Sequence, residues 1–111
     1  MVKLFRQRYL MFKVVCGKNL GKTEVWKAIV ESFRMLFGVL GLSQANLTLI
    51  EYDEKKQVGV LRCSHKFLDA VRASLTFINQ INNEKANVYS LRGSGTLKTL
   101  REFKAKIAGK L

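Results

Sequence analysis

The sequence predicts an α+β protein in which an antiparallel sheet packs against two helices and a third helix ends the chain. Short apolar runs are typical of strands, and apolar residues at three- and four-residue steps are typical of helices. A polar turn, 53–56, joins two of the expected strands. Because a connection this short joins antiparallel neighbours, we expect an antiparallel sheet. With 111 residues, the chain has the length of a single domain, 1–111.

The order of the expected elements is strand, helix, strand, strand, helix, strand and then an extra helix. This is the ferredoxin-like split βαβ pattern, βαββαβ, which places two helices on one face of the sheet. The expected elements are a strand at 8–16, a helix from 23 to about 40, strands at 47–52 and 58–63, a helix after Ser64, a strand near 87–92 and a helix from about Thr96.

The first strand is apolar on both sides, because consecutive residues of a strand point to opposite faces. Both faces of the sheet are therefore expected to be covered. The extra C-terminal helix is expected to cover part of the second face or an end. One face of the strand holds Tyr9, Met11 and Val15, and the other holds Leu10, Phe12 and Val14.

Apolar stripes and capping residues identify the helices. Thr23 is the expected N-cap of the first helix, and Gly38 and Gly41 are candidate terminators. The stripes are Trp26, Ile29, Phe33, Leu36, Phe37 and Leu40 in the first helix, Phe67, Val71, Leu75 and Ile78 in the second, and Leu97, Leu100, Phe103 and Ile107 in the last.

Positive charge dominates the composition. Twenty Lys and Arg oppose eight Asp and Glu, for a formal net charge of +12. Such a charge attracts polyanions, whether nucleic acid, an anionic membrane surface or an acidic protein. The longest apolar stretch, 35–42, is far shorter than the ~20 residues of a membrane span, and no secretory signal is visible. We expect a cytoplasmic protein that binds no membrane, with Cys16 and Cys63 as small buried side chains.

The loop between the first strand and the first helix partly matches a phosphate-binding P-loop. Residues 21–23 read Gly-Lys-Thr, as that motif ends. The spacing from Gly17 to Gly21 is one residue too short, and the expected sheet is antiparallel. A basic loop ending in the Thr23 N-cap is therefore favoured over a small nucleotide-binding enzyme.

Catalysis by the protein and metal binding are both weakly supported. His65 is the only histidine, which excludes an acid–base pair of histidines. Cys16, Cys63 and His65 do not complete the ligand set of a structural zinc site. The acidic residues within 51–54 straddle a predicted turn, where such residues are common. We expect no catalytic residue, no metal site and no cofactor bound by the protein.

Basic residues are concentrated at the two ends of the chain. Residues 93–96, Gly-Ser-Gly-Thr, precede the final helix, whose first N–H groups are suited to hold a phosphate. A plain glycine hinge with an N-cap is an equally good interpretation. The basic residues concerned are Lys3, Arg6, Arg8 and Lys13 near the start, and Lys98, Arg101, Lys104, Lys106 and Lys110 near the end.

Readout of single-stranded RNA by base stacking is not expected. In the RNA-recognition motif, which is also ferredoxin-like, aromatic residues of the sheet stack on bases. The expected strand 58–63 carries no aromatic residue. Recognition of RNA shape and phosphates fits this sequence better.

Several segments, in order and spacing, resemble the ribonuclease P protein component 2 family, the small ferredoxin-like subunit of archaeal and eukaryotic ribonuclease P. Together with the element order, the resemblance spans nearly the whole chain. The segments are Arg8-Tyr9-Leu10, Leu49-Ile50-Glu51-Tyr52-Asp53, Gly59-Val60-Leu61-Arg62-Cys63, Val71-Arg72-Ala73-Ser74-Leu75 and Gly93-Ser94-Gly95-Thr96-Leu97-Lys98.

The resemblance implies a role in 5′ maturation of precursor tRNA. In that family the RNA subunit is the catalyst and uses Mg²⁺, while the protein pairs with a larger barrel-like subunit, component 3. The pair supports the catalytic RNA, meets precursor tRNA indirectly and can self-associate into a heterotetramer. Because eukaryotic members tend to carry a longer acidic C-terminal tail, an archaeal source is expected.

The predicted RNA contacts combine the charge argument with the resemblance, which by itself carries over Arg8, Arg62 and positions within 95–101. The alternatives are another RNA-binding ribonucleoprotein component and a purely structural partner protein whose charge is incidental. The predicted RNA-binding residues are Arg6, Arg8, Lys13, Arg62, Arg92, Ser94, Gly95, Thr96, Lys98, Arg101 and Lys104.

Overall fold

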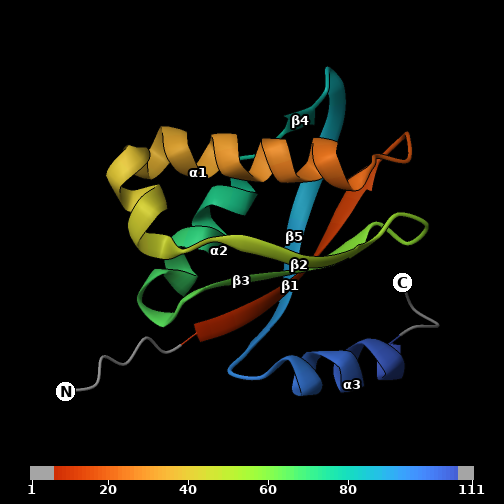
Figure 1. The fold of residues 1–111 in the computed structure, drawn as a ribbon. Helices are drawn as coiled ribbons and strands as arrows, with labels where there is room; N and C mark the ends of the chain where they lie inside the picture. The colour runs from red at the N-terminus through yellow and green to blue at the C-terminus, as the bar shows by residue number, and fades with distance from the viewer. Residues whose placement is uncertain (1–6, 108–111) are drawn as a thin grey trace.

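An antiparallel sheet of five strands, in the order β2-β3-β1-β5-β4, forms the centre of the structure (Figure 1). The computed structural model describes residues 7–107, so the predicted RNA contact Arg6 and the side chain of Ile107 lie outside the described part. The elements are β1 (Gln7–Cys16), α1 (Lys22–Ala45), β2 (Thr48–Asp53), β3 (Val58–Ser64), the 3₁₀ turn η1 (His65–Phe67), α2 (Leu68–Thr76), β4 (Gln80–Ile81), β5 (Glu84–Ser94) and α3 (Leu97–Ile107).

The predicted ferredoxin-like arrangement is confirmed. β1 lies between β3 and β5 and is antiparallel to both, as the split βαβ pattern requires. Helices α1 and α2 lie on one face of the sheet, and α3 lies on the opposite face (Figure 1). The apolar character of both faces of β1 therefore predicted a real feature, a sheet covered on two sides.

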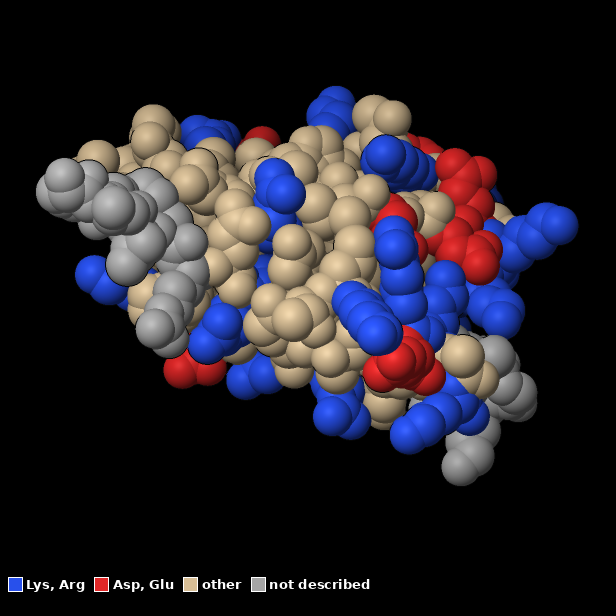
Figure 2. All heavy atoms as spheres, turned by 60° about the horizontal axis from the view of Figure 1, so that its bottom comes forward, with Lys and Arg blue, Asp and Glu red and all other residues tan. Residues whose placement is uncertain are grey.

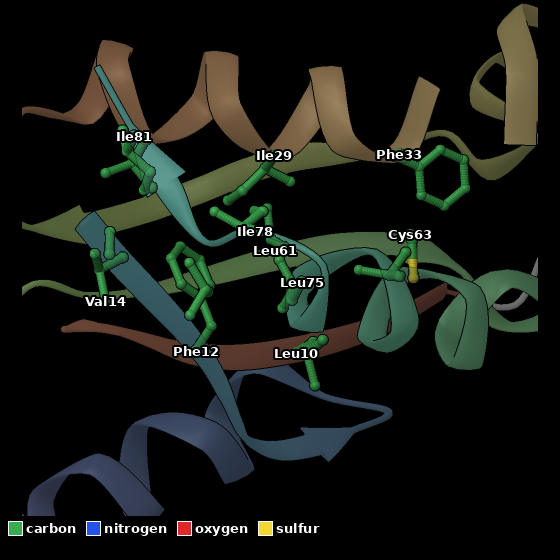
Figure 3. Packing of buried hydrophobic residues seen from close by; sticks show 14 of the residues in the cluster. Leu10, Phe12, Val14, Ile29, Phe33, Leu61, Cys63, Leu75, Ile78 and Ile81 are labelled. Atoms are coloured by element: carbon green, nitrogen blue, oxygen red, sulfur yellow. The ribbon is translucent and has the colours of Figure 1, made fainter. Parts of the chain in front are cut away.

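The larger core lies between the sheet and helices α1 and α2. From β1 it receives Leu10, Phe12 and Val14, which alternate along the strand as predicted. Figure 3 shows these side chains with those of α1 and α2 in the space between the layers. The other labelled members of this core are Ile29, Phe33, Leu61, Cys63, Leu75, Ile78 and Ile81.

A smaller core holds α3 on the other face. Leu100 of α3 is fully buried against Met11 of β1 and against Val58 and Val60 of β3. Partly buried residues on both sides of this contact extend it, and they are Tyr9, Ile50, Leu91, Leu97 and Phe103. The final helix is thus part of the folded core, not an appended arm.

Helix α1 differs from its predicted form. The predicted helix ends near Leu40, but α1 continues to Ala45. Gly38 has φ 77, and the chain kinks there before it resumes its helical path. Figure 1 shows that this last part turns away from the axis of the first part. The predicted stripe is therefore buried only through Phe33, and Leu40 is 70% exposed.

The ends of the elements contain two further corrections and one hairpin that was not predicted. The N-cap of α1 is Gly21, not Thr23, and the Glu24 carboxylate accepts the Gly21 N–H at 2.9 Å. Ser64 precedes η1, and α2 begins only after that turn. The Asn-rich segment forms the β4–β5 hairpin, in which Asn82 and Asn83 have positive φ, as a tight two-residue turn requires.

The buried contact of Leu100 provides a test of how α3 is held. We expect Leu100→Ala to lower the free energy of unfolding by about 2–5 kcal/mol, because it removes a buried side chain and leaves a cavity. The matched control is Leu40→Ala, whose side chain is 70% exposed and which should cost within roughly 0.5 kcal/mol. Urea denaturation measures both, and equal losses would show that α3 does not contribute to the core.

Candidate nucleic-acid interface

The junction between β5 and α3 begins with a hydrogen-bonded cap. The Thr96 hydroxyl accepts the Thr99 N–H at 3.3 Å, and the Ser94 hydroxyl accepts the Thr96 N–H at 3.1 Å. The first bond has the geometry of helix N-capping, in which a hydroxyl oxygen replaces a missing backbone acceptor, and the second is a turn closed by a serine hydroxyl two residues earlier. The segment 93–96 is therefore ordered by its own side chains, which supports the capped-hinge interpretation.

Two arginines lie against the glycines of this segment. A Cβ atom at Gly95 would lie 3.2 Å from Nη1 of Arg8, and one at Gly93 would lie 2.9 Å from Nη2 of Arg72. Any larger residue would displace these guanidinium groups. Glycine in a strand commonly marks such a close approach. Arg72 also faces the Asp69 carboxylate at 3.6 Å.

Arg62 belongs to the same region through strand register. It pairs with Tyr9, which in turn pairs with Ser94, so the three residues form one row across β3, β1 and β5. Tyr9 packs in the core beneath α3, and the row therefore faces the α3 side. Arg8 and Arg72 approach residues 93–96 from the other side, because Arg8 pairs with the core residue Cys63 and Arg72 lies on α2. We call Arg8, Arg62, Arg72 and Lys98, which surround residues 93–96 at this end of the sheet, the junction cluster.

Other predicted contacts lie elsewhere and are paired with protein groups. The Arg101 guanidinium lies 3.4 Å from the Glu51 carboxylate, and the Lys104 ammonium lies 3.9 Å from that of Asp53. Lys13 donates to the carbonyl oxygen of Lys56 at 3.0 Å. Their cations are thus partly engaged in joining α3 and β1 to the β2–β3 hairpin.

Arg92 occupies a third position. Its guanidinium carbon lies 5.1 Å from the centre of the Phe103 ring, which is a cation–π arrangement between β5 and α3. The predicted residues therefore do not form one surface. The structure brings Arg8, Arg62, Ser94, Gly95, Thr96 and Lys98 together and separates them from Lys13, Arg101 and Lys104.

The acidic residues at 51–54 hold secondary structure in place. The pKa of Asp53 is lowered, first because its carboxylate accepts the backbone N–H of Lys56, then that of Lys55, with the nearby charge of Lys104 adding to the effect. Glu54 accepts the Lys22 N–H at 3.3 Å. Among residues 7–107, no three His, Cys, Asp or Glu side chains are grouped as a metal site.

The loop that partly matches a P-loop has its backbone donors occupied. The N–H groups of Leu20, Gly21 and Lys22 donate to the side chains of Gln57, Glu24 and Glu54. A P-loop needs such groups free to cradle phosphates. The carboxylate of Glu54 beside this loop also repels a phosphate, so the geometry favours the structural interpretation.

The two cysteines are free thiols in the described chain, Cys63 buried and Cys16 half-buried. Burial raises the pKa of Cys63 to about 11. Its thiol is therefore protonated at neutral pH and unsuited to act as a nucleophile or metal ligand. Since Cys63 pairs with Arg8 and Cys16 lies at the other end of β1, the two do not share a site.

The face that carries α3 is rich in both charge types. Figure 2 shows Lys and Arg spread over this face, with Asp and Glu between them toward one end. The ion pairs of Glu51 and Asp53 lie on this face of the protein. Positive charge is thus distributed around an uncharged centre and does not form one continuous band.

Comparison with known proteins accounts for this architecture. The model of the Rpp14/Pop5 family matches residues 8–105. The chain belongs to the Rpp14/Pop5 family. A relative from Thermococcus gammatolerans, named ribonuclease P protein component 2, is 38% identical over 102 residues, which cover 91% of this chain and 85% of that protein.

Two further proteins are similar to this chain over most of its length. A protein of the same name from Pyrococcus furiosus is 36% identical over 86% of this chain and 80% of its own length. A chain in a structure of yeast ribonuclease MRP superposes with a TM-score of 0.69 at 13% identity, covering 99% of this chain and 100% of that one. This second likeness shows the shared fold.

One residue of the junction cluster was missed by the sequence analysis. Arg72 lies in a segment that carried the resemblance, yet its role depends on its contact with Gly93, which the sequence separates from it. The glycine within β5 was the available signal.

None of the helices within residues 7–107 has both the length and the apolar character to cross a membrane.

The lowered pKa of Asp53 predicts a pH dependence of folding. The ionised Asp53 carboxylate stabilises the fold fully above about pH 3.9, the usual pKa of an unfolded Asp. This stabilisation is lost as the pH falls through the lower pKa of the folded state. We expect Asp53→Asn to be less stable than the wild type at neutral pH, with the difference shrinking in acid.

Urea unfolding between neutral and strongly acidic pH measures this difference. Asp69→Asn is the matched control, because the side chain of Asp69 is 95% exposed. It should leave the profile close to that of the wild type. A constant difference between Asp53→Asn and wild type at all pH values would contradict the assignment.

Proposed function

We propose that this chain is a protein subunit of ribonuclease P which, with a partner protein subunit, binds and supports the catalytic RNA during 5′-end maturation of precursor tRNA. The observation that carries the proposal is the family match over residues 8–105, joined to relatives that bear the name ribonuclease P protein component 2. The net charge of +12 is of the sign that an RNA-binding subunit needs.

The junction cluster is the proposed centre of RNA contact. Its three arginines present planar guanidinium groups, which suit phosphate oxygens better than a lysine does. The N-terminus of α3 adds the positive end of a helix dipole at the same place. Ser94, Gly95 and Thr96 form the backbone between these charges, and their small size leaves the surface open to a phosphate chain.

Arg101, Lys104, Lys13 and Arg92 are proposed as secondary contacts. Arg101 keeps 64% of its side chain exposed despite its ion pair with Glu51. Such a residue is able to meet RNA while it holds α3. Because the carboxylates of Glu51 and Asp53 offset part of the charge of Arg101 and Lys104, these two residues should each contribute less to RNA binding than an unpaired cation does.

The chemistry of cleavage is proposed to belong to the RNA and its Mg²⁺. The acidic side chains Glu51, Asp53 and Glu54, the most nuclease-like group of the sequence, are engaged with Arg101, Lys104 and backbone N–H groups. The role left for the protein is to screen phosphates and brace the RNA. A cytoplasmic location and an archaeal source are consistent with its archaeal relatives.

An apolar surface on the opposite layer is proposed to bind the partner protein, ribonuclease P protein component 3. It consists of the exposed residues that follow Phe33 on α1, with Met35 80% exposed, and of Phe77 after α2. Met35, Leu36 and Phe77 line one groove of about 690 Å³. Exposed apolar patches of this kind mark protein interfaces. The members are Met35, Leu36, Phe37, Val39, Leu40 and Phe77.

A different protein is a better occupant of this surface than a second copy. Two copies would each bring a net charge of +12, which opposes their association at low salt. The members of the patch are uncharged and lie on the α1 and α2 layer, whereas α3 lies on the opposite face of the sheet. RNA and component 3 are therefore able to bind at the same time, and self-association is the alternative outcome of the test below.

Reconstitution tests the proposed function directly. The RNA subunit, component 3 and this chain are combined, and cleavage of a precursor tRNA is followed across Mg²⁺ concentrations. We expect omission of this chain to raise the Mg²⁺ concentration needed for cleavage, because RNA phosphates lose their screening. Cleavage that is unchanged at every Mg²⁺ concentration would refute the proposal.

Binding of this chain to the RNA subunit, measured at several salt concentrations, tests the phosphate contacts of the junction cluster one charge at a time. Arg8→Gln and Lys98→Gln should each weaken binding to the RNA subunit and lower the slope of log affinity against log salt by roughly 0.7–0.9. Lys27→Gln, an exposed residue of α1 on the other layer, is the matched control and should leave the slope unchanged. Equal slopes for all three variants would exclude this surface.

The partner surface has its own test. We expect the double variant Met35→Ser and Phe77→Ser to weaken binding to component 3 by at least about tenfold, as loss of interface hot spots does, while RNA affinity stays at the wild-type value. Sedimentation of the chain with and without component 3 measures this. Dissociation of a homodimer by the same variant would assign the surface to a second copy instead.

A further inference from the structure

Part of the sheet face beneath α3 is left uncovered. The centre of that face is closed by Leu100, which packs on Met11, Val58 and Val60. Along β1 and β5, farther from the junction, Tyr89 remains 53% exposed and Val15 remains 47% exposed. A large aromatic ring therefore lies open to solvent on the face where ferredoxin-like proteins commonly present their sheet to RNA.

The register places a small set of residues around this ring. Tyr89 pairs with Lys13, and Asn87 pairs with Val15, on the neighbouring strands β5 and β1. Val14, Ala86 and Val88 are buried in the core with α1 and α2. Since side chains alternate along a strand, the other set must point to the α3 side. That set is Lys13, Val15, Lys85, Asn87 and Tyr89.

The chemistry of this set matches one kind of ligand. It offers an aromatic face, an amide and two ammonium groups, and none of the five residues is acidic. Lys13, which pairs with Tyr89, donates to the Lys56 carbonyl oxygen at 3.0 Å, so its ammonium group is held on the β3 side of β1, one strand away from the ring. An aromatic ring flanked by cations is the arrangement by which proteins hold single-stranded nucleic acid without reading its sequence.

We propose that Tyr89 stacks on an unpaired base of an RNA strand, with Lys13 and Lys85 at the flanking phosphates. This proposal rests on the proposed RNA-binding function and adds a second kind of contact to it. The absence of aromatic residues from β3 argues against stacking at the centre of the sheet, which α3 covers in any case. The ring on β5 is outside that covered area.

The test is a double-mutant cycle with RNA as one partner. The full chain is titrated with a single-stranded oligoadenylate of about ten nucleotides, within the range of single-strand site sizes, and with an abasic oligomer of the same length and charge. We expect the wild type to bind the oligoadenylate roughly 5- to 100-fold more tightly, the size of one aromatic–base stack.

The variants assign this preference to the ring. Tyr89→Ala should bind both oligomers with similar affinity, near the wild-type affinity for the abasic one. Tyr89→Phe, which keeps the ring and loses the hydroxyl, should retain the preference. Lys85→Gln should weaken binding to both oligomers and reduce the salt dependence of each, because it removes a phosphate contact.

Several outcomes would overturn the proposal. If Tyr89→Ala keeps the full preference for oligoadenylate, or if the wild type shows none, no base stacks on this ring. Loss of the preference on adding component 3 would assign the ring to a protein contact in the assembled particle. None of these outcomes would refute the proposed function. That function is tested separately, by salt-dependent binding to the abasic oligomer and by the reconstitution assay.

An independent measurement covers the case in which Tyr89→Ala fails to fold. The ring protons of Tyr89 in the wild-type chain should shift upfield in NMR spectra on adding oligoadenylate, because a stacked base shields them. The abasic oligomer should not cause this shift. Equal shifts with both oligomers would count against stacking.

Discussion

Burial of β1 on both of its faces is the constraint on which the rest of the structure depends. Leu10, Met11 and Phe12 are consecutive and fully buried, although they face opposite layers. Each such side chain contributes about 1.5–3 kcal/mol when removed from water, so neither helical layer is dispensable. Because α3 occupies the middle of the second face, the positions proposed for RNA lie beside it: the end of the sheet, where the junction cluster surrounds residues 93–96, and the open strands around Tyr89.

The carboxylates of β2 determine how much of the positive charge is available. Glu51 and Asp53 pair with Arg101 and Lys104 and so connect α3 to the edge of the sheet. Exposed pairs of this kind add little stability individually, but they offset the charge of the helix that is richest in lysine. The positive charge near α3 is therefore smaller than the number of Lys and Arg residues on that helix suggests. The junction cluster, where Asp69 is the acidic partner of Arg72, keeps more of its charge.

Much of the fold was predictable because apolar patterns record which faces are buried. The two-sided apolar first strand predicted a covering helix, and the order of elements predicted the sheet. The predicted end of the first helix near Gly38 was wrong. A glycine with positive φ is typical of a helix end, but here the helix resumes after a kink. Strand β4 has two residues, too few to form a pattern. Arg101 looked like a free cation because its partner, Glu51, lies 50 residues earlier, and pairing between distant elements leaves no local trace.

The two proposed kinds of RNA contact differ in what they select. Phosphate contacts and base stacking are both tolerant of sequence, so neither reads which bases are present. Arg8 and Arg72 lie against the backbone at Gly95 and Gly93, and guanidinium groups that are placed in advance lose little freedom when a phosphate binds. The stack on Tyr89 requires a base that is unpaired. An RNA that makes both proposed contacts must present phosphates at the junction cluster and an unpaired base at Tyr89, so the two contacts together select an RNA by its shape.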